Sequence, residues 1–139
     1  MADYSKKAQP SPSQLSERRR FRNVDWTKVP ADPGVYVIDD LDEVVYVGMA
    51  GRNGRGSLRN RLRDHCSGQM VNMFSQYLFL ARVQFVPAQR ITHPRDAKAA
   101  CHEYIVKRCS FRYRVTDGAV QARELETRLK ADLEPSLNP

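Results

Sequence analysis

The chain has 139 residues, enough for one domain with a single modest core. Hydrophobic residues make up 41% of it, but no apolar run is long enough to span a bilayer. It lacks the apolar N-terminal segment of a signal peptide, and three cysteines make a poor disulfide framework, so we expect residence in the cytoplasm. The formal net charge of +7 and the pI of about 9.6 favour a polyanionic partner, nucleic acid before an anionic membrane, although a merely basic protein has the same numbers.

Charge is divided into blocks along the chain. Residues 31–48 carry five acids and no base, residues 49–66 carry five arginines against one acid, and residues 82–114 carry eight bases against two acids. A surface that binds phosphates needs its basic charge gathered in this way. The charge pattern therefore favours nucleic acid as the partner.

Residues 1–23 are predicted to form a disordered basic tail. They are rich in Ser, Pro, Gln, Lys and Arg and contain few apolar residues. Their arginine cluster could touch phosphates, but a solvated tail is at least as good an interpretation. The folded domain is expected to begin near Val24, with Trp26 and Val29 as its first core residues.

Two neighbouring strands are predicted over residues 35–38 and 44–47, separated by a polar turn. If the loop comprises residues 40–42, Tyr36 lies directly opposite Tyr46 and the two phenols share one face of the sheet. A register shift of one residue would place them on opposite faces. Their placement is therefore conditional on the turn.

The segment after the second strand, residues 48–56, contains four glycines. It lacks the Lys-Ser/Thr ending of a phosphate-binding P-loop, which argues against a nucleotide site. Ser57 is a good N-cap for a helix over residues 58–66. On that helix Arg61 and His65 lie one turn apart and flank the same face.

The rest of the chain is predicted to form three helices, over residues 70–86, 95–108 and 119–133. A strand is predicted over residues 111–115. Pro94 is typical of a helix start, and Pro135 stops the last helix. Residues 83–86 could instead form a strand.

The two tyrosines lie in the motifs Gly34-Val35-Tyr36 and Tyr46-Val47-Gly48, which resemble the signature of the GIY-YIG nuclease superfamily. Further residues match that family in its order along the chain: Arg61, His65, Glu126 and Asn138. Each of these residue types is common when taken singly, as a strand aromatic, a solvated arginine, a packing histidine or a water-facing acid. Ordered matches over residues 34–138 are much harder to obtain by chance.

The resemblance implies an α+β fold, with a small three-stranded mixed or antiparallel sheet flanked by helices. It makes residues 24–139 a single domain and residues 67–108 an extra helical insertion. That expansion resembles free-standing members such as the GIY-YIG restriction endonucleases. The expected partner is DNA, with no membrane, and a homodimer is plausible because two strands require two cuts.

The resemblance also implies a metal-dependent DNA endonuclease. One of Tyr36 and Tyr46 would orient or deprotonate a water, which needs a nearby cation because a free phenol, with a pKa near 10, is a poor base. Arg61 would grip the scissile phosphate, His65 would bind phosphate or shuttle a proton, and Glu126 would hold one Mg²⁺ or Mn²⁺. The further substrate-binding candidates are Gly48, Arg52, Arg55, Arg59 and Asn138.

Met49 stands where many members of the family have a lysine. This departure keeps a second hypothesis open, a catalytically inactive nucleic-acid-binding module of the same fold. A third is a basic protein-interaction domain. The pairs His65-Cys66 and Cys101-His102 supply zinc-type ligands, but their spacing matches no usual zinc pattern, and buried free cysteines are favoured.

Overall fold

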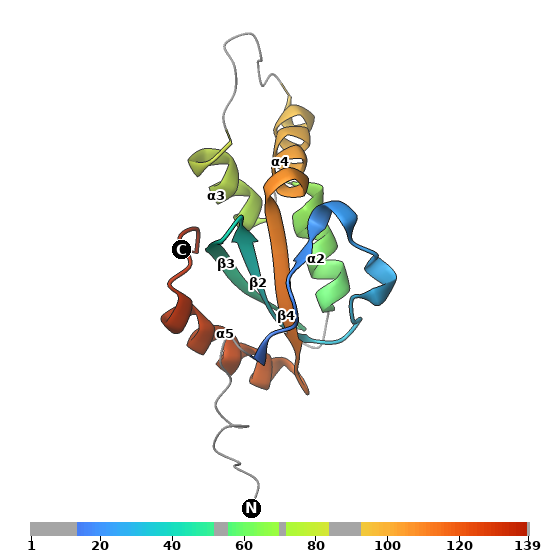
Figure 1. The fold of residues 1–139 in the computed structure, drawn as a ribbon, viewed down its shortest axis with the longest axis vertical. Coiled ribbons are helices and arrows are strands. Elements are labelled where there is room, and N and C mark those ends of the chain that lie inside the picture. Colours follow the sequence, from blue (N-terminus) through green and yellow to red (C-terminus); the bar gives the residue numbers. More distant parts are fainter. Residues whose placement is uncertain (1–13, 52–55, 70–71, 84–92, 139) are drawn as a thin grey trace, which may run out of the picture.

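The computed structural model describes residues 14–51, 56–69, 72–83 and 93–138, and its centre is one antiparallel sheet (Figure 1). The sheet has four strands in the order β1-β4-β2-β3: β1 Arg19–Arg20, β2 Gly34–Asp40, β3 Glu43–Ala50 and β4 Cys109–Val115. The helices are α2 Leu58–Ser67, α3 Met73–Ala81, α4 Pro94–Arg108 and α5 Ala119–Leu133, with the 3-10 turns η2 Phe21–Asn23 and η3 Trp26–Lys28. The α+β class is confirmed, with four strands in place of the predicted three.

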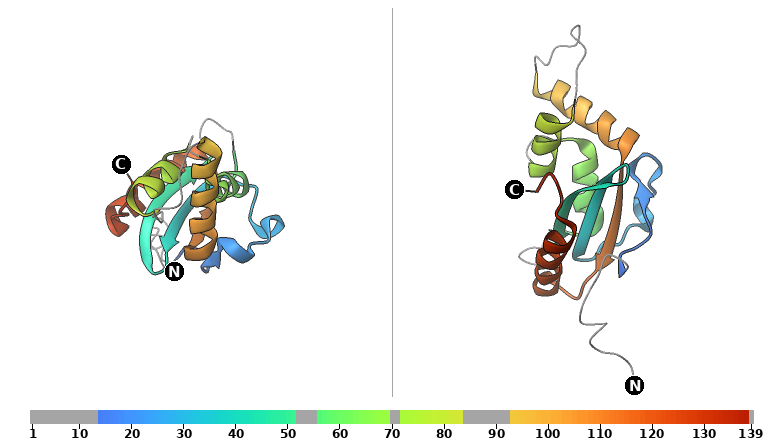
Figure 2. Two further views of the ribbon diagram at one scale, coloured as in Figure 1. Left: turned by 90° about the horizontal axis from the view of Figure 1, so that it is seen from above. Right: turned by 60° about the vertical axis from the view of Figure 1, so that its left-hand side comes forward.

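Helices cover both faces of β2, which is buried along its whole length. Tyr36 and Ile38 pack in the cluster that includes α2, α3 and α4, whereas Val35 and Val37 pack against α5. Seen from above in Figure 2, α2 and α5 lie on opposite sides of the sheet. This double burial explains why β2 is apolar at successive positions and does not alternate with polar residues.

Residues 15–23 belong to the fold, so the predicted start of the domain near Val24 was wrong. Arg19 and Arg20 of β1 pair with β4. Phe21 is 2% exposed, and its ring lies 4.9 Å from that of Phe111. A two-residue strand among charged side chains gives no periodic signal, so its partner β4 decides its structure. Residues 1–13 of the predicted tail over residues 1–23 lie outside the described residues.

Helices α2, α4 and α5 begin and end close to their predicted positions, whereas α3 is shorter than the predicted helix over residues 70–86 and ends at Ala81. Ser57 caps α2 by accepting from the backbone N–H of Asn60, and Pro94 is the first residue of α4. The possible strand at residues 83–86 lies largely outside the described residues. Within the described part of the chain, no helix is long and apolar enough to cross a membrane.

The β2–β3 turn is one residue shorter than predicted. Asp40 pairs with Glu43, which leaves a two-residue loop of Leu41 and Asp42. Leu41 has a φ of 53°, in the left-handed region that such tight hairpin turns require.

A β-bulge follows that turn and restores the shared face. The register shifts after Ile38 and leaves Val45 without a partner on β2. Tyr36 therefore pairs with Gly48, and Ile38 pairs with Tyr46. The two phenols are diagonal neighbours on one face, and not directly opposite as predicted. Without the extra residue they would lie on opposite faces.

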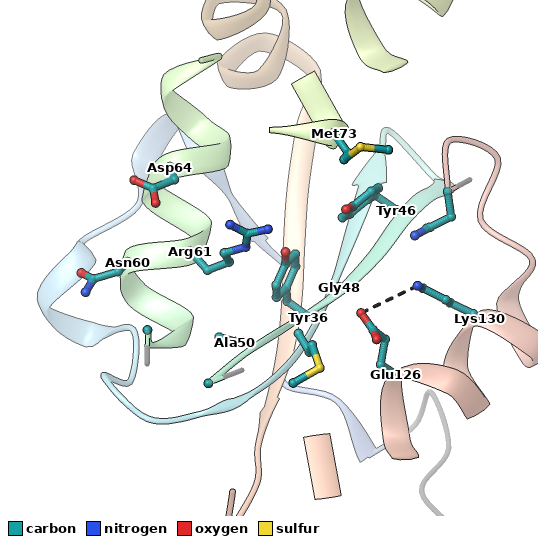
Figure 3. A pocket seen from close by; sticks show the side chains of 14 residues that line it. Tyr36, Tyr46, Gly48, Ala50, Asn60, Arg61, Asp64, Met73, Glu126 and Lys130 are labelled. Carbon is teal, nitrogen blue, oxygen red and sulfur yellow. Dashed lines mark ion pairs between the residues drawn. The ribbon is translucent and has the colours of Figure 1, made fainter. Parts of the chain in front are cut away.

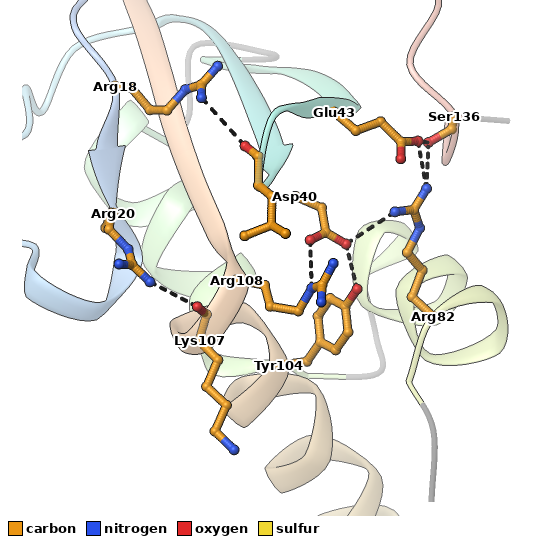
Figure 4. A network of polar contacts seen from close by, with 10 residues as sticks. Arg18, Arg20, Asp40, Glu43, Arg82, Tyr104, Lys107, Arg108 and Ser136 are labelled. Atoms are coloured by element: carbon orange, nitrogen blue, oxygen red, sulfur yellow. Dashed lines mark hydrogen bonds and ion pairs between the residues drawn. The ribbon is translucent and has the colours of Figure 1, made fainter.

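A buried carboxylate at the end of β2, that of Asp40, ties the hairpin to α3 and α4 (Figure 4). It accepts hydrogen bonds from the Tyr104 hydroxyl at 2.5 Å, Arg108 Nε at 2.9 Å and Arg82 Nη1 at 3.2 Å. Arg82 also reaches Glu43 at 2.6 Å. Removing one partner would leave charge buried without compensation, so the network fixes the hairpin relative to both helices.

Replacing Phe21 by alanine tests the contribution of the N-terminal segment. Phe21→Ala should lower the free energy of unfolding by about 3–5 kcal/mol, because it empties a buried aromatic site. Urea denaturation followed by circular dichroism measures this change. Arg22→Ala, at an exposed neighbour, should change it by less than about 0.5 kcal/mol. Equal, small effects of both variants would contradict the packing described here.

Candidate active site

The two tyrosines form one wall of an open cleft with a volume of about 580 Å³ (Figure 3). Their ring centroids are 6.5 Å apart, and the ring planes differ by 26°. Strands β2 and β3 and helices α2, α3 and α5 contribute to the cleft, which is lined by Tyr36, Tyr46, Gly48, Met49, Ala50, Gly51, Gly56, Asn60, Arg61, Asp64, Met73, Glu126, Lys130 and Asn138. The fold thus brings together residues that lie up to about a hundred positions apart.

Gly48 makes room for the ring of Tyr36. The two residues are cross-strand partners, and a Cβ at Gly48 would overlap the hydroxyl and Cζ of Tyr36. Gly34, at the start of the first motif, is equally constrained because a Cβ there would overlap the backbone carbonyl of Arg114. Both glycines of the motifs therefore have steric reasons that do not depend on any ligand.

Behind the cleft surface, Tyr36 forms a buried hydrogen bond with His65. The Tyr36 hydroxyl lies 2.6 Å from His65 Nε2, and the two side chains are 1% and 0% exposed. Burial, and then the guanidinium of Arg61, lower the pKa of His65 to about 3, so the imidazole is neutral. Burial, followed by the neighbouring Tyr46, raises the pKa of Tyr36, against a lowering effect of Arg61. A neutral phenol therefore faces a neutral imidazole.

Arg61 supplies positive charge beside the Tyr36 hydroxyl. Helix α2 carries both Arg61 and His65, and the 3.6-residue period sets Arg61 at the cleft and His65 beneath it. In Figure 3 the guanidinium points toward the Tyr36 ring. Among the ion pairs of the described residues none involves Arg61, so its charge is available to an anion in the cleft.

Glu126 of α5 brings a carboxylate to the cleft. Its side chain is 13% exposed, and Oε2 lies 3.8 Å from Nζ of Lys130, one helical turn on. No group of three or more His, Cys, Asp or Glu side chains suited to a metal occurs in the described residues. The Glu126 carboxylate is a hard oxygen ligand of the kind that a Mg²⁺-like ion prefers.

Asn138 occupies the edge of β3, the outer strand of the sheet. Its amide copies a backbone pairing: Oδ1 accepts from Val47 N at 2.8 Å, and Nδ2 donates to Val47 O at 2.9 Å. The Leu137 N–H also donates to the Val45 carbonyl at 2.8 Å. The C-terminal segment thereby covers an edge that would otherwise be open, and it holds Asn138 at the cleft.

Not every predicted residue reaches the cleft. Arg59 is not among the lining residues, because its guanidinium donates to the carbonyls of Val29 at 2.9 Å and Thr27 at 3.3 Å. Arg52 and Arg55 lie outside the described residues.

The basic block of residues 82–114 is partly used inside the fold. Arg82 and Arg108 pair with Asp40, and Arg112 pairs with Asp39 at 2.9 Å. These side chains neutralise buried acids and do not form the phosphate-binding face that the charge pattern indicates.

Other cleft residues are not predicted from the sequence. Lys130 follows Glu126 by four positions, and Asn60 and Asp64 flank Arg61 by one and three positions. Helical spacing from the two predicted residues is the signal that would have found them. Met73 comes from α3, whose contact with the cleft has no signal in the local sequence.

No protein-family model and no curated protein matches the chain. Among solved structures, it is similar to the GIY-YIG N-terminal endonuclease domain of UvrC from Thermotoga maritima, a point mutant bound to its catalytic divalent cation. The two chains are 21% identical, the match covers 82% of this chain and 90% of that one, and the TM-score is 0.44.

The neutral state of His65 predicts a pH dependence of stability. The pKa of about 3 in the folded chain is below the ordinary 6.5, so the unfolded chain alone binds this proton as the pH falls below about 6.5. The free energy of unfolding should therefore drop by about 1.4 kcal/mol between pH 7.5 and 5.5. Urea titrations at both pH values measure it, and His65→Gln should remove most of the drop. An unchanged drop in that variant would contradict a neutral, buried His65.

Gly48→Ala should displace the Tyr36 ring and cost about 1–3 kcal/mol of stability, because the added methyl overlaps the phenol. Thermal unfolding measures the cost, and tyrosine near-ultraviolet circular dichroism reports the ring. Gly118→Ala is the control, since a Cβ there meets no atom within 4 Å. A Gly48 variant as stable as that control would contradict the close packing.

Proposed function

We propose that the chain is a DNA endonuclease that hydrolyses phosphodiester bonds with one divalent cation. The observation that carries this proposal is the buried hydrogen bond between Tyr36 and His65, which lies directly behind a cleft that Arg61 and Glu126 also line. A base, a phosphate-binding cation and a carboxylate are what a phosphodiesterase must gather at one point. The formal net charge of +7 suits a polyanionic substrate.

Tyr36 activates the water in this proposal. The Tyr36 oxygen accepts a proton from the water while the Tyr36 proton passes to His65 Nε2, 2.6 Å away. The resulting hydroxide attacks phosphorus, the bond to the leaving oxygen breaks, and that oxygen takes a proton from solvent. The phenol stays neutral throughout, so the raised pKa of Tyr36 is no obstacle.

Arg61 has two roles in this scheme. Its guanidinium binds the phosphate and stabilises the charge that gathers on the equatorial oxygens in the transition state. Its charge also lowers the pKa of His65. A bound phosphate would offset that charge, so His65 becomes a better proton acceptor when the substrate is in place.

Glu126 would hold the divalent cation, Mg²⁺ or Mn²⁺, which prefers carboxylate and phosphate oxygens. When bound, the ion supplies a Lewis acid that polarises the phosphate. Lys130, now 3.8 Å from the carboxylate, supplies positive charge at the same side of the cleft. We expect DNA as the substrate, a cytoplasmic location and a possible homodimer for double-strand cleavage.

A second candidate function is nucleic-acid binding without cleavage. Met49 favours it, because this thioether lines the cleft where a lysine would strengthen the hold on a phosphate. Salt-sensitive DNA binding without cleavage in either metal would support this alternative.

The proposed activity predicts that Glu126→Gln abolishes cleavage. The rate should fall at least about 100-fold, because the amide cannot hold a divalent cation as the carboxylate does. Nicking of supercoiled plasmid, and cleavage of branched and mismatched duplexes, would be measured with Mg²⁺, Mn²⁺ and a chelator. Arg61→Ala should lose activity to a similar extent.

Glu124→Gln is the matched control, since this exposed acid lies on the same helix and does not line the cleft. It should cleave like the wild-type protein. Cleavage that persists in Glu126→Gln, or that falls equally in both variants, would contradict the role given to Glu126.

A further inference from the structure

Asn72, the residue before α3, contacts the back of the proposed site. It caps α3, because its Oδ1 accepts from the backbone N–H of Ser75 at 2.8 Å. The same Oδ1 lies 3.3 Å from His65 Nδ1. A buried polar chain therefore runs from the Tyr36 hydroxyl through His65 to Asn72.

The cap fixes which atom of the Asn72 amide faces His65. A backbone N–H can only donate, so the atom that meets Ser75 N must be the amide oxygen. That oxygen can only accept, so His65 Nδ1 must carry the proton in the contact between them. A neutral imidazole has a single N–H, and Nε2 is left as an acceptor for the Tyr36 hydroxyl.

We propose that Asn72 is a positioning residue that sets the tautomer of His65, so that Nε2 is free to receive the Tyr36 proton. This inference rests on the proposed function, and it gives α3 a part in the reaction. Asn72 does not line the cleft and acts only through His65. The arrangement follows the general rule that a catalytic imidazole is oriented by a third group on its other nitrogen.

Capping alone does not explain an asparagine at this position. Within the described residues, its Nδ2 is buried without a hydrogen-bond partner, as is the hydroxyl of Ser75. A serine would cap equally well and would leave no amide nitrogen unsatisfied. An aspartate would also accept from Nδ1, but its charge would favour the imidazolium, which cannot accept a proton. An amide satisfies the cap and the neutral imidazole together.

Asn72→Ser tests the inference, because serine keeps the helix cap and is too short to hold His65 Nδ1. Long-range ¹H–¹⁵N NMR of the full chain at neutral pH reads the tautomer directly. The wild-type protein should show protonated Nδ1 and unprotonated Nε2 in His65. The variant should lose that single tautomer, and its cleavage rate should fall roughly 10- to 100-fold, the range seen when outer-shell partners of metal-binding histidines are removed.

Ser75→Ala is the matched control. It removes a buried hydroxyl that has no partner among the described residues, on the same turn of α3, and should keep both the tautomer and the cleavage rate. Any of three results would overturn the inference. They are an Nε2–H tautomer in the wild-type protein, an unchanged tautomer in Asn72→Ser, and full activity of that variant despite a changed tautomer. The NMR measurement does not depend on enzymatic activity, so the two proposals fail separately. Absence of cleavage by the wild-type protein would count against the proposed function. The tautomer of His65 in the variants decides whether Asn72 sets it.

Discussion

One unpaired residue in β3, Val45, determines the face on which the two tyrosines lie. Side chains alternate along a strand, so a two-residue turn without this bulge would send Tyr36 and Tyr46 to opposite faces. With the bulge, Gly48 comes to lie under the Tyr36 ring, and the Tyr36 hydroxyl reaches His65. The carbonyl of Val45, which has no partner on β2, accepts a hydrogen bond from the Leu137 N–H. The bulge that places both phenols on one face therefore also anchors the C-terminal segment that carries Asn138.

Two buried polar systems then fix the site from either side. Hydrogen bonds join Tyr36 of β2, His65 of α2 and Asn72 at the start of α3, which orders three elements against one another. At the end of β2, Asp40 binds side chains from α4 and from the residue after α3. Each system would be costly to leave unpaired, so both hold β2 in place against the helices that pack on it.

The net charge of the chain overestimates how many basic side chains are available to bind phosphates. Arginines of the second basic block neutralise acids at the end of β2, and Arg59 of the first block binds backbone carbonyls. The cleft keeps Arg61 and Lys130. Local positive charge at the reacting centre, and not the total, is therefore the relevant electrostatic feature for the proposed reaction.

The sequence determined the types and approximate limits of β2, β3, β4 and the four helices, because apolar periodicity, caps and prolines are local signals. It also predicted the candidates Tyr36, Arg61, His65, Glu126 and Asn138, whose order along the chain matched a known pattern. The tertiary structure alone decided the strand register, the inclusion of Phe21, the pairing of the arginines with buried acids, and the place of Asn72 behind His65. These features depend on contacts between residues far apart in the chain, and no local pattern encodes which partner a side chain will meet.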